Sequence, residues 1–142
     1  MRTATLLYAR QKGIASAGVE LTPLGNLIAN VRLDPPSDLH AALEFAEGLV
    51  RERNEFKNHS FPKELVDWIG QENAVTLSNY LMKLTELSDH RLRRWLQLAV
   101  SSALRPCSAW LAGSIKPQVD PSRRTSPIEY HFLRAARILY KA

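Results

Sequence analysis

Apolar residues follow a helical period over most of this chain. From residue 38 onward they recur every three or four positions, which is the spacing of a helix that buries one face. The predicted helices span 38 to about 58, 62–69, 71 to about 87, 90–104, and a last stretch that starts at 126–127. The second half of the chain and much of the first are therefore expected to be helical.

Prolines mark the breaks between these helices. Asp34-Pro35-Pro36 ends one helix, and Ser37 is the expected N-cap of the next. Arg105-Pro106 interrupts a helical pattern, and because an interior proline costs about 3 kcal/mol in a helix, we expect a kink or two helices there. Residues 116–124, KPQVDPSRR, hold two prolines among polar neighbours and predict a loop.

The first 33 residues follow a different pattern. Residues 3–12 predict a short helix that Gly13 ends, and residues 14–20 predict a strand of small and apolar side chains. Thr22 is the expected N-cap of a helix over residues 23–32, which begins with a proline. The expected fold class is thus mainly α with a small α/β element, in which one strand at about 14–20 precedes a helical region.

Glu20 is the candidate binding residue of this N-terminal unit. It would place a carboxylate near the carboxyl end of the strand, where doubly wound folds bind the ribose hydroxyls of a cofactor. The alternative is an acid that interacts with the N-terminus of the next helix, an interaction worth about 0.3–1 kcal/mol at such a position. Position alone leaves both interpretations open.

Charge is distributed unevenly along the chain. Residues 1–82 contain 8 Lys/Arg and 10 Asp/Glu, a balance of −2, whereas residues 83–142 contain 11 Lys/Arg and 4 Asp/Glu, a balance of +7. This asymmetry indicates a polyanionic partner near the C-terminal part, with nucleic acid as the leading candidate. The alternative is a set of solvated basic helix faces.

Composition and motifs exclude several classes of function. No run of 18 apolar residues and no signal peptide is present, so we expect a cytoplasmic protein without a membrane partner. The single Cys107 fits a reducing compartment and is expected to be buried rather than nucleophilic. The four histidines lack metal-ligand spacing, and no G-x-S-x-G or Walker A motif occurs. We therefore predict no metal site and assign no catalytic residue.

The N-terminal stretch TATLLYARQKGIASAGVELTPLGNLIANVRL resembles a segment of bacterial DNA amino-methyltransferases that act on cytosine N4 or adenine N6. In that family a D-P-F-x-G-S-G loop precedes a Thr-Thr-Leu-Leu helix, a strand with an acidic turn, and an apolar helix. Thr5-Leu6-Leu7 matches the helix start, Gly13 its end, and Gly18 to Pro23 the strand and turn. The family's usual acid at the turn is Asp, and Glu20 is one methylene longer.

Residues 101–124 are similar to a helical insertion ending in K-P-x-x-D that some of these enzymes carry. The resemblance implies a fragment of a Rossmann-like sheet with S-adenosyl-L-methionine as cofactor, contacted by Glu20 and Thr5. It divides the chain into a partial cofactor-binding unit (1–33), a helical insertion (34–115), and a basic loop with a C-terminal helix (116–142). DNA is then the expected partner. The candidate phosphate contacts are Lys116, Arg123 and Arg124 in the loop and Arg94, with Arg91 and Arg93, on the preceding helix.

Two motifs of the family are missing from this sequence. The glycine loop is absent, and so is the catalytic D/S-P-P-Y motif, since Asp34-Pro35-Pro36 is followed by Ser37, which cannot stack on a base. The resemblance therefore implies a methyltransferase fragment of a restriction–modification type that is inactive alone. A complementing fragment or self-association would be required. The alternative is a non-catalytic helical module that binds nucleic acid or a protein.

Overall fold

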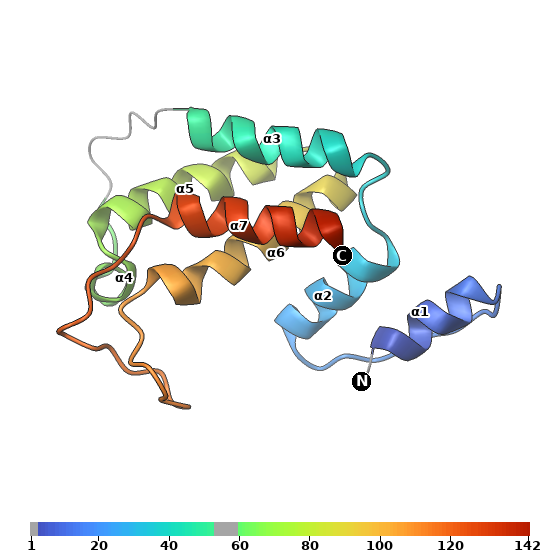
Figure 1. Ribbon diagram of the computed structural model, residues 1–142, viewed down its shortest axis with the longest axis horizontal. Helices are drawn as coiled ribbons and strands as arrows, with labels where there is room; N and C mark the ends of the chain where they lie inside the picture. The colour runs from blue at the N-terminus through green and yellow to red at the C-terminus, as the bar shows by residue number, and fades with distance from the viewer. Residues whose placement is uncertain (1–2, 53–59) are drawn as a thin grey trace.

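A computed structural model describes residues 3–52 and 60–142 of the chain and is mainly α-helical within them (Figure 1). This confirms the expectation of a mainly α fold with little sheet. Seven helices lie in the described residues: α1 (Thr3–Gln11), α2 (Pro23–Leu33), α3 (Leu39–Arg51), α4 (Lys63–Ile69), α5 (Gln71–Glu86), α6 (His90–Cys107) and α7 (Ile128–Lys141). The part of the predicted 38–58 helix that falls on residues 53–58 lies outside the described residues.

The core lies between α7 and the helices around it. Figure 1 shows α7 at the centre, with α3 along one side and α6 behind it, and α2 and α5 pack on α6 in turn. Trp95, Tyr80 and Phe132 are the largest side chains that are fully buried. The rings of Tyr80 and Phe132 lie 4.9 Å apart between their centroids, at a tilt of 43°. Residues from all three predicted divisions of the chain contribute to this one core.

Asn73 joins three helices through its side chain. Its Nδ2 donates to the carbonyl oxygen of Ile69 at 2.8 Å and to that of Ser126 at 2.9 Å, and its Oδ1 accepts from the backbone N–H of Ile128 at 2.9 Å. Asn73 is 7% exposed. The same amide therefore satisfies the end of α4 and the start of α7, which has no capping side chain of its own.

The helix ends follow local capping rules. Thr22 caps α2 by accepting from the N–H of Gly25, and Pro23 occupies the first position, as predicted. Gly13 ends α1 with φ +68°, and the N–H of Ile14 donates to the carbonyl of Ala9, the pattern of a Schellman motif. Asp38, rather than the expected Ser37, caps α3 by accepting from the N–H of Ala41.

Pro106 does not divide α6 in two. The helix continues through Pro106 and ends one residue later, at Cys107. Ser108 then turns into an extended conformation, and its N–H donates to the carbonyl of Arg105. The proline thus lies in the last turn, so its missing N–H affects only the end of the helix, and the expected interruption is a simple termination.

The strand expected at 14–20 does not form. These residues are irregular, and the only bridge in the described part of the chain is an isolated antiparallel one between Trp110 and Val119. A strand needs a neighbour to pair its backbone N–H and C=O groups, and no second strand lies beside this segment in residues 3–52 and 60–142. The small and apolar side chains of residues 14–20 have a pattern typical of a strand, but a pattern within one segment cannot provide the second strand that pairing requires.

The loop between α6 and α7 is irregular at residues 116–124, as predicted. It doubles back on itself, since the N–H of Leu111 donates to the carbonyl of Gln118 at 2.9 Å. The indole of Trp110 anchors it between Trp68, at 5.4 Å between ring centroids, and Arg105, whose guanidinium lies 4.7 Å from the ring centroid. This clamp holds the loop against the ends of α4 and α6.

Candidate functional site

The turn before α2 holds Glu20 in a defined position. Its Oε1 accepts from the N–H of Thr22 at 3.1 Å and from the Thr22 hydroxyl at 3.0 Å, and that hydroxyl accepts from the N–H of Gly25 at 3.1 Å. The hydrogen bonds from the Thr22 backbone and side chain lower the pKa of the Glu20 carboxyl below its usual value. The carboxylate therefore lies over the first turn of α2. This is the position expected for an acid that interacts with the N-terminus of that helix.

Gly25 makes room for this arrangement. A Cβ atom at position 25 would lie 2.6 Å from Cδ of Glu20 and 2.6 Å from Oγ1 of Thr22. Real Cβ atoms do not approach other atoms so closely, so a larger residue would displace the carboxylate from the turn. Gly25 thus allows Glu20 to take this position because it has no side chain, and not because it adopts an unusual backbone conformation.

Glu20 lines an open pocket between the start of α2 and α6. The wall along α2 combines Pro23 and Leu27 with Asn26 and Asn30, and Nδ2 of Asn30 donates to the carbonyl oxygen of Asn26 at 2.9 Å. Arg94 and Gln97 of α6 form the facing wall. The pocket brings together Glu20 and Arg94, which the sequence assigned to the cofactor and to DNA respectively. Thr5 lies exposed on α1 and does not line this pocket.

Asp34 ties the cations of α6 to the end of α2. Its two carboxylate oxygens accept from Arg91 at 2.9 Å and from Arg94 at 3.0 Å, and Arg94 also donates to Oδ1 of Asn30 at 3.3 Å. Arg93 donates to the backbone carbonyl of Leu87. These three arginines therefore have internal partners, and the contacts of Arg91 and Arg94 link α6 to α2 and its C-terminal end.

The basic loop presents its cations differently. Arg123 donates from Nη1 to the carbonyl oxygen of Trp110 at 2.6 Å, so its guanidinium closes the loop. Lys116 and Arg124 are exposed. All three loop cations that are predicted to contact DNA are therefore exposed to solvent, and Arg123 is the one tied to Trp110.

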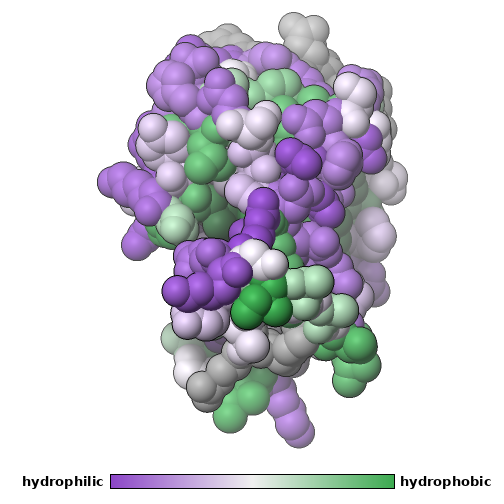
Figure 2. Space-filling model, turned by 90° about the vertical axis from the view of Figure 1, so that its right-hand side faces the viewer, coloured by the Kyte–Doolittle hydropathy of each residue, from purple (hydrophilic) through white to green (hydrophobic). Residues whose placement is uncertain are grey.

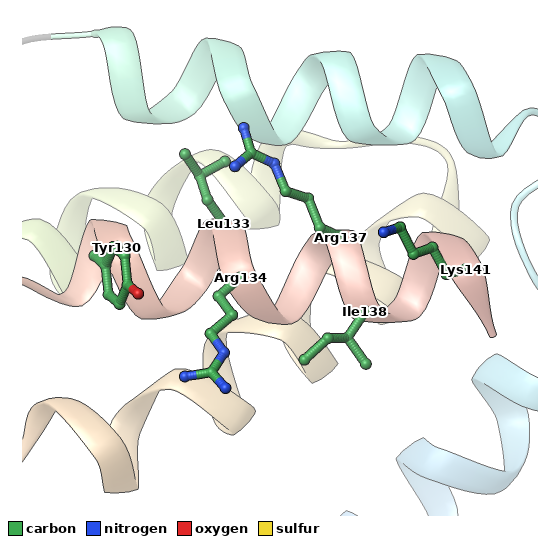
Figure 3. A pocket seen from close by; sticks show the side chains of 6 residues that line it. All are labelled: Tyr130, Leu133, Arg134, Arg137, Ile138 and Lys141. Atoms are coloured by element: carbon green, nitrogen blue, oxygen red, sulfur yellow. The ribbon is translucent and has the colours of Figure 1, made fainter.

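The outer face of α7 is a surface that the sequence reasoning missed. Six side chains line an open pocket along it: Tyr130, Leu133, Arg134, Arg137, Ile138 and Lys141 (Figure 3). The pattern that could have found it is the run of cations at positions 134, 137 and 141, which helical spacing places on one face.

A serine and a histidine meet at the start of α7. Oγ of Ser126 lies 2.7 Å from Nε2 of His131. Burial, followed by the charges of Arg134 and Arg123, lowers the pKa of His131. Within the described residues no carboxylate hydrogen-bonds to this imidazole, so the pair lacks the acid that orients a catalytic histidine. The contact is a structural hydrogen bond at the helix start.

Other chemistry is limited in the described part of the chain. No group of three or more His, Cys, Asp or Glu side chains there is placed to hold a metal ion. Cys107 is fully buried, as expected from the sequence. Burial raises the pKa of its thiol to about 11. None of the described helices combines the length and apolar character that crossing a membrane requires.

Comparison with models of known protein families, with curated proteins and with solved structures found no match for this chain.

Proposed function

We propose that this chain is a segment of an S-adenosylmethionine-dependent DNA amino-methyltransferase, in which Glu20 binds the ribose of the cofactor. The support is the order of elements around Glu20. A helix closed by Gly13 leads into an irregular segment, then into a carboxylate held at the start of α2 by Thr22. The family that the N-terminal stretch resembles has the same order, with a strand in place of the irregular segment.

The observation that carries this proposal is the exposure of the two apolar residues on either side of Glu20. Val19 is 79% exposed and Leu21 92% exposed, and neither belongs to the core. Burying a Val or Leu side chain is worth about 1.5–3 kcal/mol, so this segment is stabilised when a sheet covers it. Figure 2 looks at this end of the molecule and shows apolar surface in its lower half.

The residues present fit one part of the cofactor. A carboxylate accepts hydrogen bonds from the two hydroxyls of a ribose, and the lowered pKa of Glu20 keeps it ionised for that role at neutral pH. When bound, S-adenosylmethionine supplies the methyl group. Thr5 does not reach the same pocket, so the ribose end is the part for which this chain provides a contact. The glycine loop and the catalytic tetrapeptide have to come from elsewhere.

Reconstitution tests the proposal. The reading frames next to this one should encode polypeptides with D-P-F-x-G-S-G and S-P-P-Y motifs. Co-purified with residues 1–142, these polypeptides should transfer tritiated methyl groups to DNA, whereas the chain alone should not. In the complex, Glu20→Ala should raise KM for S-adenosylmethionine at least about tenfold, as expected for the loss of charge-assisted hydrogen bonds.

Glu64→Ala provides the matched control, because Glu64 is an exposed acid on α4, away from the Glu20 pocket. Methyl transfer by the chain alone would overturn the prediction of an inactive fragment. Equal KM values for the two variants would remove Glu20 from the cofactor site.

A non-catalytic helical binding module is the second candidate. The exposed cations and apolar side chains on α7 favour it. In that case neighbouring frames lack both motifs, and no mixture with their products methylates DNA.

A further inference from the structure

The exposed stripe on α7 has the spacing of a helix-docking surface. We define the α7 stripe as Tyr130, Leu133, Arg134, Arg137, Ile138 and Lys141, which recur at intervals of three and four. Tyr130 is 64% exposed and Ile138 is 58% exposed, although α7 buries its other side in the core. The stripe spans 11 residue steps, or about 16 Å at the helical rise. That length matches about three turns of a second helix.

The charges on the α7 stripe have one sign. Arg134, Arg137 and Lys141 are cationic, and no acidic residue lines the same pocket. In Figure 3 Arg137 reaches toward α3, whereas Arg134 extends to the opposite side of α7. Within residues 3–52 and 60–142, Arg134 and Lys141 take part in no ion pair. Charge complementarity therefore calls for an acidic occupant.

The packing of α3 on α7 shows how such an occupant would be bound. Glu47 of α3 accepts from Arg137 at 3.1 Å, while apolar residues of the two helices pack together in the core. A helix with an apolar strip and one flanking carboxylate, that of Glu47, thus already covers one side of α7. The α7 stripe offers the same combination, aliphatic and aromatic groups beside guanidinium and ammonium groups, on its open side.

We propose that the α7 stripe docks an amphipathic helix of a partner protein whose apolar positions are flanked by Asp or Glu. Helix-in-groove recognition places apolar anchors at i, i+3, i+4 and i+7, which is the spacing found here. A nucleic-acid strand fits less well, because the exposed apolar side chain of Ile138 lies among the cations and cannot form a hydrogen bond or ion pair with a phosphate. A second α7 is also disfavoured, because like charges would face each other.

The contact is small, so the affinity is modest. An interface of three helical turns lies below the size of stable protein–protein interfaces, which bury about 1,200–2,000 Å². We therefore expect a dissociation constant in the micromolar range for an isolated helix. This inference is independent of methyl transfer, because it concerns a surface separate from the Glu20 pocket.

A designed peptide tests the proposal on the full chain. The probe is a fluorescein-labelled helix of about 18 residues, or five turns, with Leu at heptad positions a and d and Glu at e and g. Fluorescence anisotropy should give saturable binding. Amide shifts in ¹H–¹⁵N spectra should change at α7 and not at α1. Ile138→Ser and Arg134→Glu should each weaken binding at least tenfold.

Matched controls separate docking from general charge and from misfolding. Met82→Ser replaces a similarly exposed apolar residue on α5, and Lys63→Glu reverses an exposed charge on α4; both should bind as the wild type does. A peptide with Lys at e and g should not bind. The proposal is overturned if neither α7 variant weakens binding, if the acidic peptide does not bind at all, or if a single-stranded oligonucleotide displaces it from α7. Circular dichroism of each variant confirms that it is folded.

Discussion

Residues 3–21 and the helical body from α2 to α7 obey the same local rules but differ in what they bury. α1 has a well-formed C-terminal Schellman motif, and α6 has a well-formed N-cap at Asp89. Yet Leu6 is the buried residue of α1, whereas α6 buries residues along most of its length. Capping fixes where a helix begins or ends. Burial decides how firmly it is held.

The two regions also differ in how they are joined to the rest. In Figure 1, α1 lies at the edge of the molecule beside α2, while α7 packs on α3, α5 and α6 with its inner face. The body uses buried side-chain hydrogen bonds such as those of Asn73, which cross more than fifty positions of sequence. The turn at Glu20 uses exposed hydrogen bonds across two or three positions. Long-range contacts therefore belong to the body, and short-range contacts to the N-terminal region.

The sharpest test of this contrast replaces one aromatic residue in each region. Phe132→Ala removes a fully buried ring that contacts Tyr80 and should lower the free energy of unfolding by about 3–5 kcal/mol. Tyr8→Ala removes a ring that is 61% exposed and should change it by less than about 0.5 kcal/mol. Urea unfolding followed by circular dichroism measures both. Similar losses would mean that α1 is part of the cooperative core.

A second substitution tests the long-range hydrogen bonds of the body. Asn73→Ala leaves the carbonyl of Ser126 and the N–H of Ile128 without their partner, and should cost about 1–3 kcal/mol. Asn26→Ala is the control, because Asn26 is exposed and its side chain accepts a hydrogen bond from Asn30, just four positions away. Thermal unfolding compares the two. An equal effect would contradict the role assigned to Asn73 in positioning α7.

The smallest expected effect concerns the Glu20 turn and its pH dependence. Because hydrogen bonds from Thr22 depress the pKa of Glu20, its stabilisation is present above the ordinary value of 4.5 and is lost as the pH falls through the lower folded value. Amide exchange at Gly25 should therefore speed up in acid relative to its intrinsic rate. Glu20→Gln should remove that step, and Glu64→Gln should keep it. A carboxyl titration of Glu20 at or above 4.5, followed by ¹³C NMR, would refute the geometry.

Local signals in the sequence were sufficient to place most helix ends. Thr22 with Pro23, Gly13 and Gly70 act within one turn of their own position, and each lies where its residue type predicts. Pro106 was harder, because its effect depends on how many residues of helix follow it. The sequence pattern extended beyond the proline, but α6 stops at Cys107.

The surfaces could not be predicted in the same way, because they depend on partners far along the chain. Arg94 looked like a phosphate contact, but Asp34, sixty positions earlier, accepts its hydrogen bond. Arg123 was expected to contact DNA, and although it is exposed, its guanidinium donates to the carbonyl of Trp110 in its own loop. Conversely, the exposed face of α7 depends on which side of the helix the core covers. A count of charged residues in the sequence locates the cations but does not show which residues they bind in the fold.

The single thiol of the chain acts as a built-in reporter of these differences. Cys107 is fully buried at the end of α6, and its pKa near 11 leaves little thiolate to react at neutral pH. An alkylating reagent can modify it only when the body opens, whereas fraying of α1 leaves it protected. Labelling kinetics of the unmodified chain therefore reports the opening of the core, without an introduced probe.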